Sequence, residues 1–191
     1  LASLKFVVSM QKRLLLSEKL LDITIDRLCQ QLIENHDDFS ESVLIGLQPR
    51  GTYLAKKIQG KLQNHLDQKI PMGILDITFF RDDFRRKSSP IAANETNIPF
   101  LVENKKVILI DDVLFTGRSV RAALDAMNAY GRPKLVELMV LIDRKYTRDL
   151  PIQPNYIGKA INSMLSQKVI VEWSGVDNSE SNDVWLLNKD A

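Results

Sequence analysis

The chain has 191 residues, of which 45% are hydrophobic and 26% charged, and its formal net charge is only +2. That length suits one domain with a sizeable core, and the small net charge gives no global argument for nucleic-acid binding. The single cysteine excludes an internal disulfide and fits a reducing compartment, and no apolar run approaches the ~20 residues of a membrane span. We therefore expect a cytoplasmic protein with one domain at 10–191 and an N-terminal extension at 1–9.

The first half of the chain alternates helical and strand patterns. Ser17, a good N-cap residue, precedes a helical face formed by Leu21, Ile25, Leu28 and Leu32. The apolar run 43–47 predicts a buried strand, followed by a turn and a helix that ends near Gln63. A further strand is expected at 73–80. The polar stretch 81–99 has no period, which favours a flexible active-site loop.

The second half repeats this alternation. The run 107–110 predicts a buried strand that Asp111 and Asp112 end, and the next helix is closed by Gly131 and Pro133. Another strand is expected at 135–142. The segments 168–173 and 184–187 predict a closing β ribbon. Alternating strands and helices indicate an α/β fold with a doubly wound, mainly parallel sheet, whose ligands bind beyond the carboxyl ends of the strands.

The segment that follows the strand at 107–110 carries the chemistry. Asp111 and Asp112 can accept hydrogen bonds from vicinal ribose hydroxyls. The backbone N–H groups of Thr116 to Ser119, at the positive end of the next helix, can surround a phosphate. This order of residues predicts a pocket for a sugar phosphate.

Two other nucleotide-binding patterns are absent from the chain. Gly46 and Gly51 have the spacing of a P-loop, but Thr52 and Tyr53 stand where that motif needs lysine and serine or threonine. No Gly-x-Gly-x-x-Gly follows a strand, so a dinucleotide-binding fold is also disfavoured.

The string VILIDDVLFTGRS at 107–119 resembles the signature of type I phosphoribosyltransferases, which bind 5-phosphoribosyl diphosphate. The strings IGLQPRGTYLAKKI, DITFFRDD, VLIDR and LPIQPNYIGKAI resemble, in order and spacing, the bifunctional pyrimidine operon attenuator and uracil phosphoribosyltransferase (PyrR) family. This similarity runs from about Gln11 to Trp173. It implies the type I phosphoribosyltransferase fold with a small hood formed by the chain ends.

The resemblance also implies roles for individual residues. Asp111 and Asp112 would hold the ribose hydroxyls, and Arg50 and Arg144 would act on the pyrophosphate, so these four are the expected catalytic residues. The substrate-binding residues that the resemblance implies are Arg50, Gly51, Arg81, Asp82, Asp83, Val107, Ile108, Leu109, Ile110, Asp111, Asp112, Val113, Leu114, Phe115, Thr116, Gly117, Arg118, Ser119, Asp143, Arg144, Tyr156, Ile157, Gly158 and Lys159.

Finer expectations follow from the same resemblance. The peptide bond between Pro49 and Arg50, in the pyrophosphate loop, would be cis. The loop after 81–83 would close over the leaving group, and residues 156–159 would read the uracil edge from the hood. Mg²⁺, bound largely through the diphosphate, would lie near Asp143.

The chain departs from the family pattern at three places. Pro49 stands where many relatives have threonine, which removes a backbone donor. Phe115 stands where purine-specific members carry an aspartate that accepts a proton from the base, which disfavours a purine substrate. The turn 145–148 replaces a shorter one, which alters the expected hood contacts. The favoured function is transfer of phosphoribose to uracil, giving UMP and pyrophosphate.

Other functions stay open at this point. One is a regulator that binds leader RNA with little enzymatic activity, and another is a phosphoribosyltransferase for orotate, hypoxanthine or xanthine. No membrane partner is expected, and a homodimer or higher homo-oligomer is. The basic residues considered for RNA are Lys12, Arg13, Lys56, Lys57, Lys61 and Arg132, and the loop residues Arg81, Arg85, Arg86 and Lys87 could bind RNA or pyrophosphate.

Overall fold

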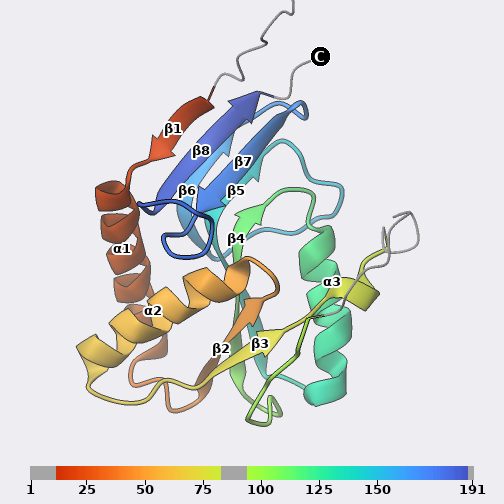
Figure 1. Ribbon diagram of the computed structural model, residues 1–191. Helices are drawn as coiled ribbons and strands as arrows, with labels where there is room; N and C mark the ends of the chain where they lie inside the picture. The colour runs from red at the N-terminus through yellow and green to blue at the C-terminus, as the bar shows by residue number, and fades with distance from the viewer. Residues whose placement is uncertain (1–11, 83–93, 189–191) are drawn as a thin grey trace, which may run out of the picture. The chain divides into compact units, whose positions relative to one another are not determined.

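The computed structural model describes residues 12–82 and 94–188 (Figure 1). The chain divides into two compact units. The larger unit comprises Ile23–Asn162, and the smaller one is formed by both chain ends, up to Asp22 and from Ser163 onward. We describe each unit by itself. No helix of the described residues is both long and apolar enough to cross a membrane.

The larger unit is built on a five-stranded sheet with every strand parallel to its neighbours. The strands are β2 (Ser42–Leu47), β3 (Met72–Leu75), β4 (Lys106–Leu114), β5 (Leu135–Lys145) and β6 (Tyr156–Asn162), in the order β3-β2-β4-β5-β6. The order reverses between β2 and β4, because the chain moves outward from β2 to β3 and then outward from β4 to β5. The predicted doubly wound parallel sheet is confirmed, and such reversal points are where ligands bind.

Helices cover both faces of this sheet. On one face, α1 (Glu18–His36) contacts α2 (Gly51–Leu66), where the thiol of Cys29 lies 3.8 Å from the carbonyl oxygen of Ile58. On the other face lies α3 (Arg118–Met127), followed by η3 (Asn128–Tyr130). The buried residues that pack with α3 are alternate strand positions, as a sheet with period two requires: Val43, Ile45, Leu47, Val107 and Leu109.

Two strand boundaries differ from the sequence prediction. The strand expected at 73–80 ends at Leu75, because the Asp76 carboxylate accepts hydrogen bonds from the Thr78 amide (3.0 Å) and hydroxyl (2.6 Å). The chain then turns through η1 (Thr78–Phe80). In contrast, β4 does not end at the two acids, because its pairing with β5 continues to Leu114. The acids are therefore held by a strand ladder.

The smaller unit is a three-stranded antiparallel sheet. Its strands are β1 (Lys12–Leu16), β7 (Gln167–Glu172) and β8 (Asp183–Asn188), in the order β1-β8-β7. The ribbon predicted from the C-terminal pattern is confirmed. The pairing of β1 with β8 was not predicted, because it joins segments about 170 residues apart and the strand has only five residues.

Candidate active site

A pair of half-buried acids, Asp111 and Asp112, lies near the carboxyl end of β4. The Asp112 amide donates to Asp111 Oδ1 over 2.9 Å. Burial and the charge of Asp112 raise the pKa of Asp111 well above its usual value, and burial also raises the pKa of Asp112. Arg50 offsets this in part, because its Nε lies 3.8 Å from Asp112 Oδ2. The pair therefore favours ligands that bring hydroxyl donors or positive charge.

Gly51 explains how Arg50 comes to lie beside the acids. A Cβ at this position would lie 2.4 Å from the Ile110 carbonyl oxygen and 2.9 Å from Asp111 Cα. Only glycine lets α2 begin this close to β4. The cis bond expected between Pro49 and Arg50 was wrong: the cis bond of this loop is Gln48–Pro49. The bond that precedes a proline nitrogen is the one with the weakest trans preference.

The turn between β4 and α3 has the features expected of a phosphate cradle. Gly117 adopts a φ of +91° at the N-cap, and it provides no side-chain cap for α3. The carbonyl oxygen of Thr116 accepts hydrogen bonds from the amides of Asp149 (3.0 Å) and Leu150 (3.2 Å). The turn is thus held by backbone contacts, while the first N–H groups of α3 lack a capping side chain and suit an anion.

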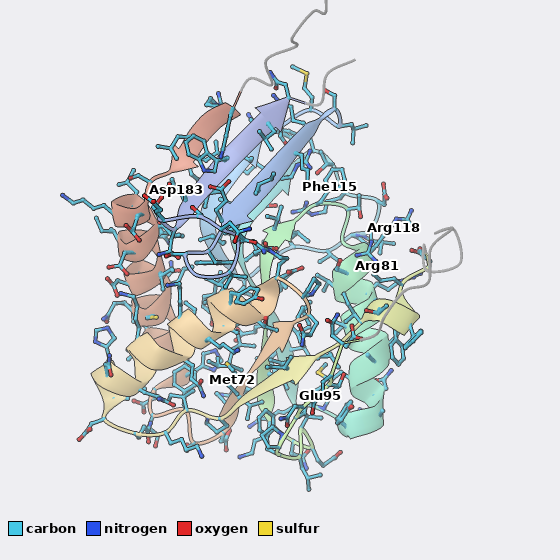
Figure 2. The ribbon with its side chains drawn as sticks, viewed as in Figure 1. Met72, Arg81, Glu95, Phe115, Arg118 and Asp183 are labelled. Carbon is cyan, nitrogen blue, oxygen red and sulfur yellow. The ribbon has the colours of Figure 1, made fainter. Side chains whose placement is uncertain are left out.

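Basic side chains gather around this turn. Arg81 Nη1 donates to Ser119 Oγ over 2.9 Å. Arg118 Nη1 binds the Asp82 carboxylate, and Arg118 Nε lies 3.0 Å from Asp149 Oδ2. Figure 2 shows Arg81 and Arg118 beside the amino end of α3. Asp83, which was also expected to bind substrate, lies outside the described residues, as does most of the loop expected at 81–99.

Asp143 and Arg144 lie at the end of β5. The Arg144 guanidinium stands 4.0 Å from the centre of the Phe115 ring, and its burial lowers the pKa of Arg144. Only 4% of Arg144 is exposed, so the ring replaces water on one side of the charge. The Asp143 carboxylate is bound by Arg148. The two predicted residues are therefore brought to the carboxyl edge of the sheet, level with the end of β4.

Arg148 is a site residue that the sequence prediction missed. Its guanidinium donates to the carbonyl oxygens of Phe115 (2.5 Å), Arg144 (2.9 Å) and Ile152 (3.1 Å). It therefore braces the ends of β4 and β5 against each other. The only signal in the sequence was a basic residue in the lengthened turn 145–148.

The expectation that residues 156–159 lie in a hood formed by the chain ends was wrong. They belong to β6, in the larger unit, because the open edge of β5 offers a complete parallel ladder. The register places Ile157 opposite Val140, which is opposite Asp111, so β5 lies between the acids and β6. The carbonyl oxygens of Ile157 and Gly158 accept hydrogen bonds from Arg27, at 3.1 and 2.6 Å.

The acids fit a magnesium ion only in combination with a ligand. Within residues 12–82 and 94–188, no three His, Cys, Asp or Glu side chains gather in a way that could hold a metal. Mg²⁺ is commonly held by one or two carboxylates together with substrate phosphates. Asp111 and Asp112 could supply those carboxylate oxygens, whereas Asp143 is already bound by Arg148.

Comparisons with known proteins agree with this geometry. Residues 14–177 match the phosphoribosyl transferase domain. Proteins named bifunctional protein PyrR are 43% identical over 86% of this chain and 92% of the relative in Halalkalibacterium halodurans, and 47% identical over 76% and 78% in Caldicellulosiruptor bescii. A solved hypoxanthine phosphoribosyltransferase of Trypanosoma cruzi has a TM-score of 0.69 and 15% identity, over 93% of this chain and 97% of that chain. At that identity, the solved structure bears on the fold alone.

Proposed function

This chain belongs to the phosphoribosyltransferase family, in the branch of the bifunctional PyrR proteins, and we propose that it transfers phosphoribose from 5-phosphoribosyl diphosphate to uracil. The products would be UMP and pyrophosphate. The observation that carries this proposal is the half-buried pair Asp111–Asp112, held on β4 directly before the turn into α3. A sugar with two hydroxyls and a 5-phosphate complements both parts at once.

The acids would act on the ribose ring. As the bond to pyrophosphate breaks, positive charge develops on the ring, and nearby carboxylates stabilise it. Burial raises the pKa of both acids, so their charged forms are costly until hydroxyl donors or cations arrive. The ligand would thus provide the hydrogen bonds that water would give the carboxylates if they were fully exposed. The strand would hold the ribose ring in position.

The basic residues would act on the leaving group. Arg50, 3.8 Å from Asp112, and Arg144, buried against Phe115, can donate charge-assisted hydrogen bonds to pyrophosphate oxygens. When bound, Mg²⁺ carried largely by the diphosphate would neutralise the negative charge that builds there. No protein nucleophile is required for this transfer.

The choice of base is tested by measuring pyrophosphate release with each nucleobase in turn, at constant donor and Mg²⁺. We expect release with uracil, the base that the family resemblance implies. We expect none with a purine, because Phe115 cannot accept a proton from it. A reaction without added base serves as the hydrolysis control. Release with orotate, hypoxanthine or xanthine in place of uracil would refute the base assignment, and release that no added base increases above this control would refute the transferase.

RNA binding is a second candidate function, because the relatives are named bifunctional. A basic surface outside the active site would have to carry it, and affinity would fall steeply with salt. Two of the candidate lysines already have acidic partners: Lys12 lies 2.9 Å from Glu172 and Lys61 2.7 Å from Asp26. Filter binding of a structured pyrimidine leader RNA at two salt concentrations tests the idea, and the absence of saturable binding would leave the enzyme alone.

A further inference from the structure

The Asp82 carboxylate, in the chain that leaves η1, binds two arginines in the first turns of α3. Asp82 Oδ2 is bound by Arg118 and lies 3.3 Å from Arg121 Nη2. The two arginines are three residues apart in α3, so they lie on one face of the helix. The contact holds the chain beside the amino end of α3, next to the turn that joins this helix to β4.

The residue before Asp82, Arg81, also contacts α3. Arg81 Nη1 donates to Ser119 Oγ over 2.9 Å, and Ser119 is part of the predicted phosphate cradle. The positive charge of Arg81 also opposes the rise in the pKa of Asp111 that burial and Asp112 cause. Arg81 therefore faces the sugar-phosphate side of the site.

We propose that Arg81 binds the 5-phosphate of the ligand, and that Asp82 is a positioning residue that holds Arg81 against Ser119. This inference rests on the proposed function and changes one part of it, since the sequence placed residues 81–83 over the leaving group. In this proposal Asp82 acts through Arg81 and not on the ligand directly, because its Oδ2 is shared by two guanidinium groups.

The chemistry needs only a small rearrangement. In the structure, Ser119 Oγ accepts a hydrogen bond from Arg81. A phosphate entering the cradle can accept hydrogen bonds from both the Ser119 hydroxyl and the Arg81 guanidinium. Charge-assisted bonds of this kind are stronger than the neutral acceptor contact that they replace.

Calorimetric binding of two ligands separates the two assignments of Arg81. UMP carries the 5-phosphate without the leaving group, and inorganic pyrophosphate is the leaving group alone. We expect Arg81→Gln to weaken UMP binding about 10- to 100-fold and pyrophosphate binding less than about twofold. The exposed Arg132→Gln, the same chemical change elsewhere in the larger unit, should alter neither.

The opposite pattern, or unchanged UMP binding by Arg81→Gln, would overturn the inference while leaving the transferase intact. If the unaltered protein bound neither UMP nor 5-phosphoribosyl diphosphate, both the inference and the proposed function would fail.

A double-mutant cycle tests the positioning role of Asp82. Asp82→Asn should weaken UMP binding about tenfold in the natural background and hardly at all in the Arg81→Gln background, because its effect passes through Arg81. Asp149→Asn removes a different partner of Arg118 and should have little effect. Equal losses from Asp82→Asn in both backgrounds would show that Asp82 acts independently of Arg81, which would overturn the positioning role.

Discussion

The polar groups at the two ends of the parallel sheet differ in their partners: like charges adjoin at the carboxyl end, whereas donors meet acceptors at the amino end. At the carboxyl end, Asp111 and Asp112 lie side by side with raised pKa values. At the amino end, His36 contacts Ser42 Oγ through Nδ1 (2.8 Å) and Glu137 Oε2 through Nε2 (2.8 Å). Tyr156 completes the second group, because its hydroxyl donates to Glu137 Oε2 over 3.2 Å.

The difference lies in whether the polar groups satisfy one another. Donors and acceptors of the amino-end group match within the protein, as is usual for buried polar atoms. The two acids at the carboxyl end carry the same charge and repel, and Arg50 offsets this only in part, so a ligand that brings hydroxyl donors or positive charge would stabilise their charged forms. Perturbed groups of this kind are typical of functional sites, and the comparison separates a group whose contacts lie within the fold from the group that we propose binds the ligand.

The largest expected effect comes from neutralising the acid pair. Asp111→Asn with Asp112→Asn should lower turnover about 1,000-fold or more, since the ribose loses both acceptors of its hydroxyls and a stabilising charge. Initial rates of pyrophosphate release measure this loss. Near-normal turnover would remove the proposed ribose clamp.

The same double variant should unfold at a higher temperature at pH 7. A raised pKa means that the folded protein disfavours the charged carboxylate, so stability declines as pH rises through that pKa, and a neutral amide removes the penalty. Each kcal/mol recovered would raise the Tm by about 2–4 °C. A fall in Tm would contradict the contrast between the two ends.

Gly51→Ala should damage the carboxyl end through packing alone. The added methyl group would meet the backbone of Ile110 and Asp111, which costs about 1–3 kcal/mol or more and displaces Arg50. Urea unfolding and donor KM measure the two consequences. Gly60→Ala is the matched control, because it lies on the same helix with nothing within 4 Å and should gain up to about 1 kcal/mol.

Tyr156→Phe should show the reverse pattern at the amino end. Burial raises the pKa of Tyr156 to about 12, so the hydroxyl stays protonated and its loss leaves Glu137 short of a donor. We expect about 1–3 kcal/mol of lost stability in urea and an unchanged KM for uracil. An increased KM with unchanged stability would place Tyr156 in the base site instead.

The smallest expected effect is a pH dependence from His36. Burial lowers the pKa of His36, although Glu137 opposes the shift. Stability from this residue is therefore present above the unfolded value of about 6.5 and is lost as pH falls below it. Urea midpoints at pH 8 and pH 5.5 should differ less in His36→Gln than in the natural protein, and an equal difference would refute the role of His36.

Much of this arrangement could be predicted from the sequence. The apolar strand before Asp111, the small turn residues and the helical stripe after them are local patterns, and the resemblance of the whole string fixed the fold. The boundary errors arose from side-chain contacts that a pattern does not contain. Asp76, for example, ends β3 by binding backbone and hydroxyl groups of Thr78.

The parts that were missed depend on contacts between distant segments. The β6 strand was assigned to a hood because nothing local indicates that the edge of β5 is open. Arg148 was passed over because most of its partners are backbone carbonyls, which leave no trace in the sequence. The amino-end network was missed because its members are far apart in the sequence: His36 and Tyr156 are separated by 120 residues.

The most direct measurement is a crystal structure with 5-phosphoribosyl diphosphate and Mg²⁺ bound. We predict the 5-phosphate on the amides of Thr116 to Ser119 and the ribose hydroxyls within hydrogen-bonding distance of Asp111 and Asp112. A donor bound elsewhere, or with its ribose turned away from both acids, would contradict the claim that the carboxyl end of the sheet, where the two acids lie, is the sugar-phosphate site.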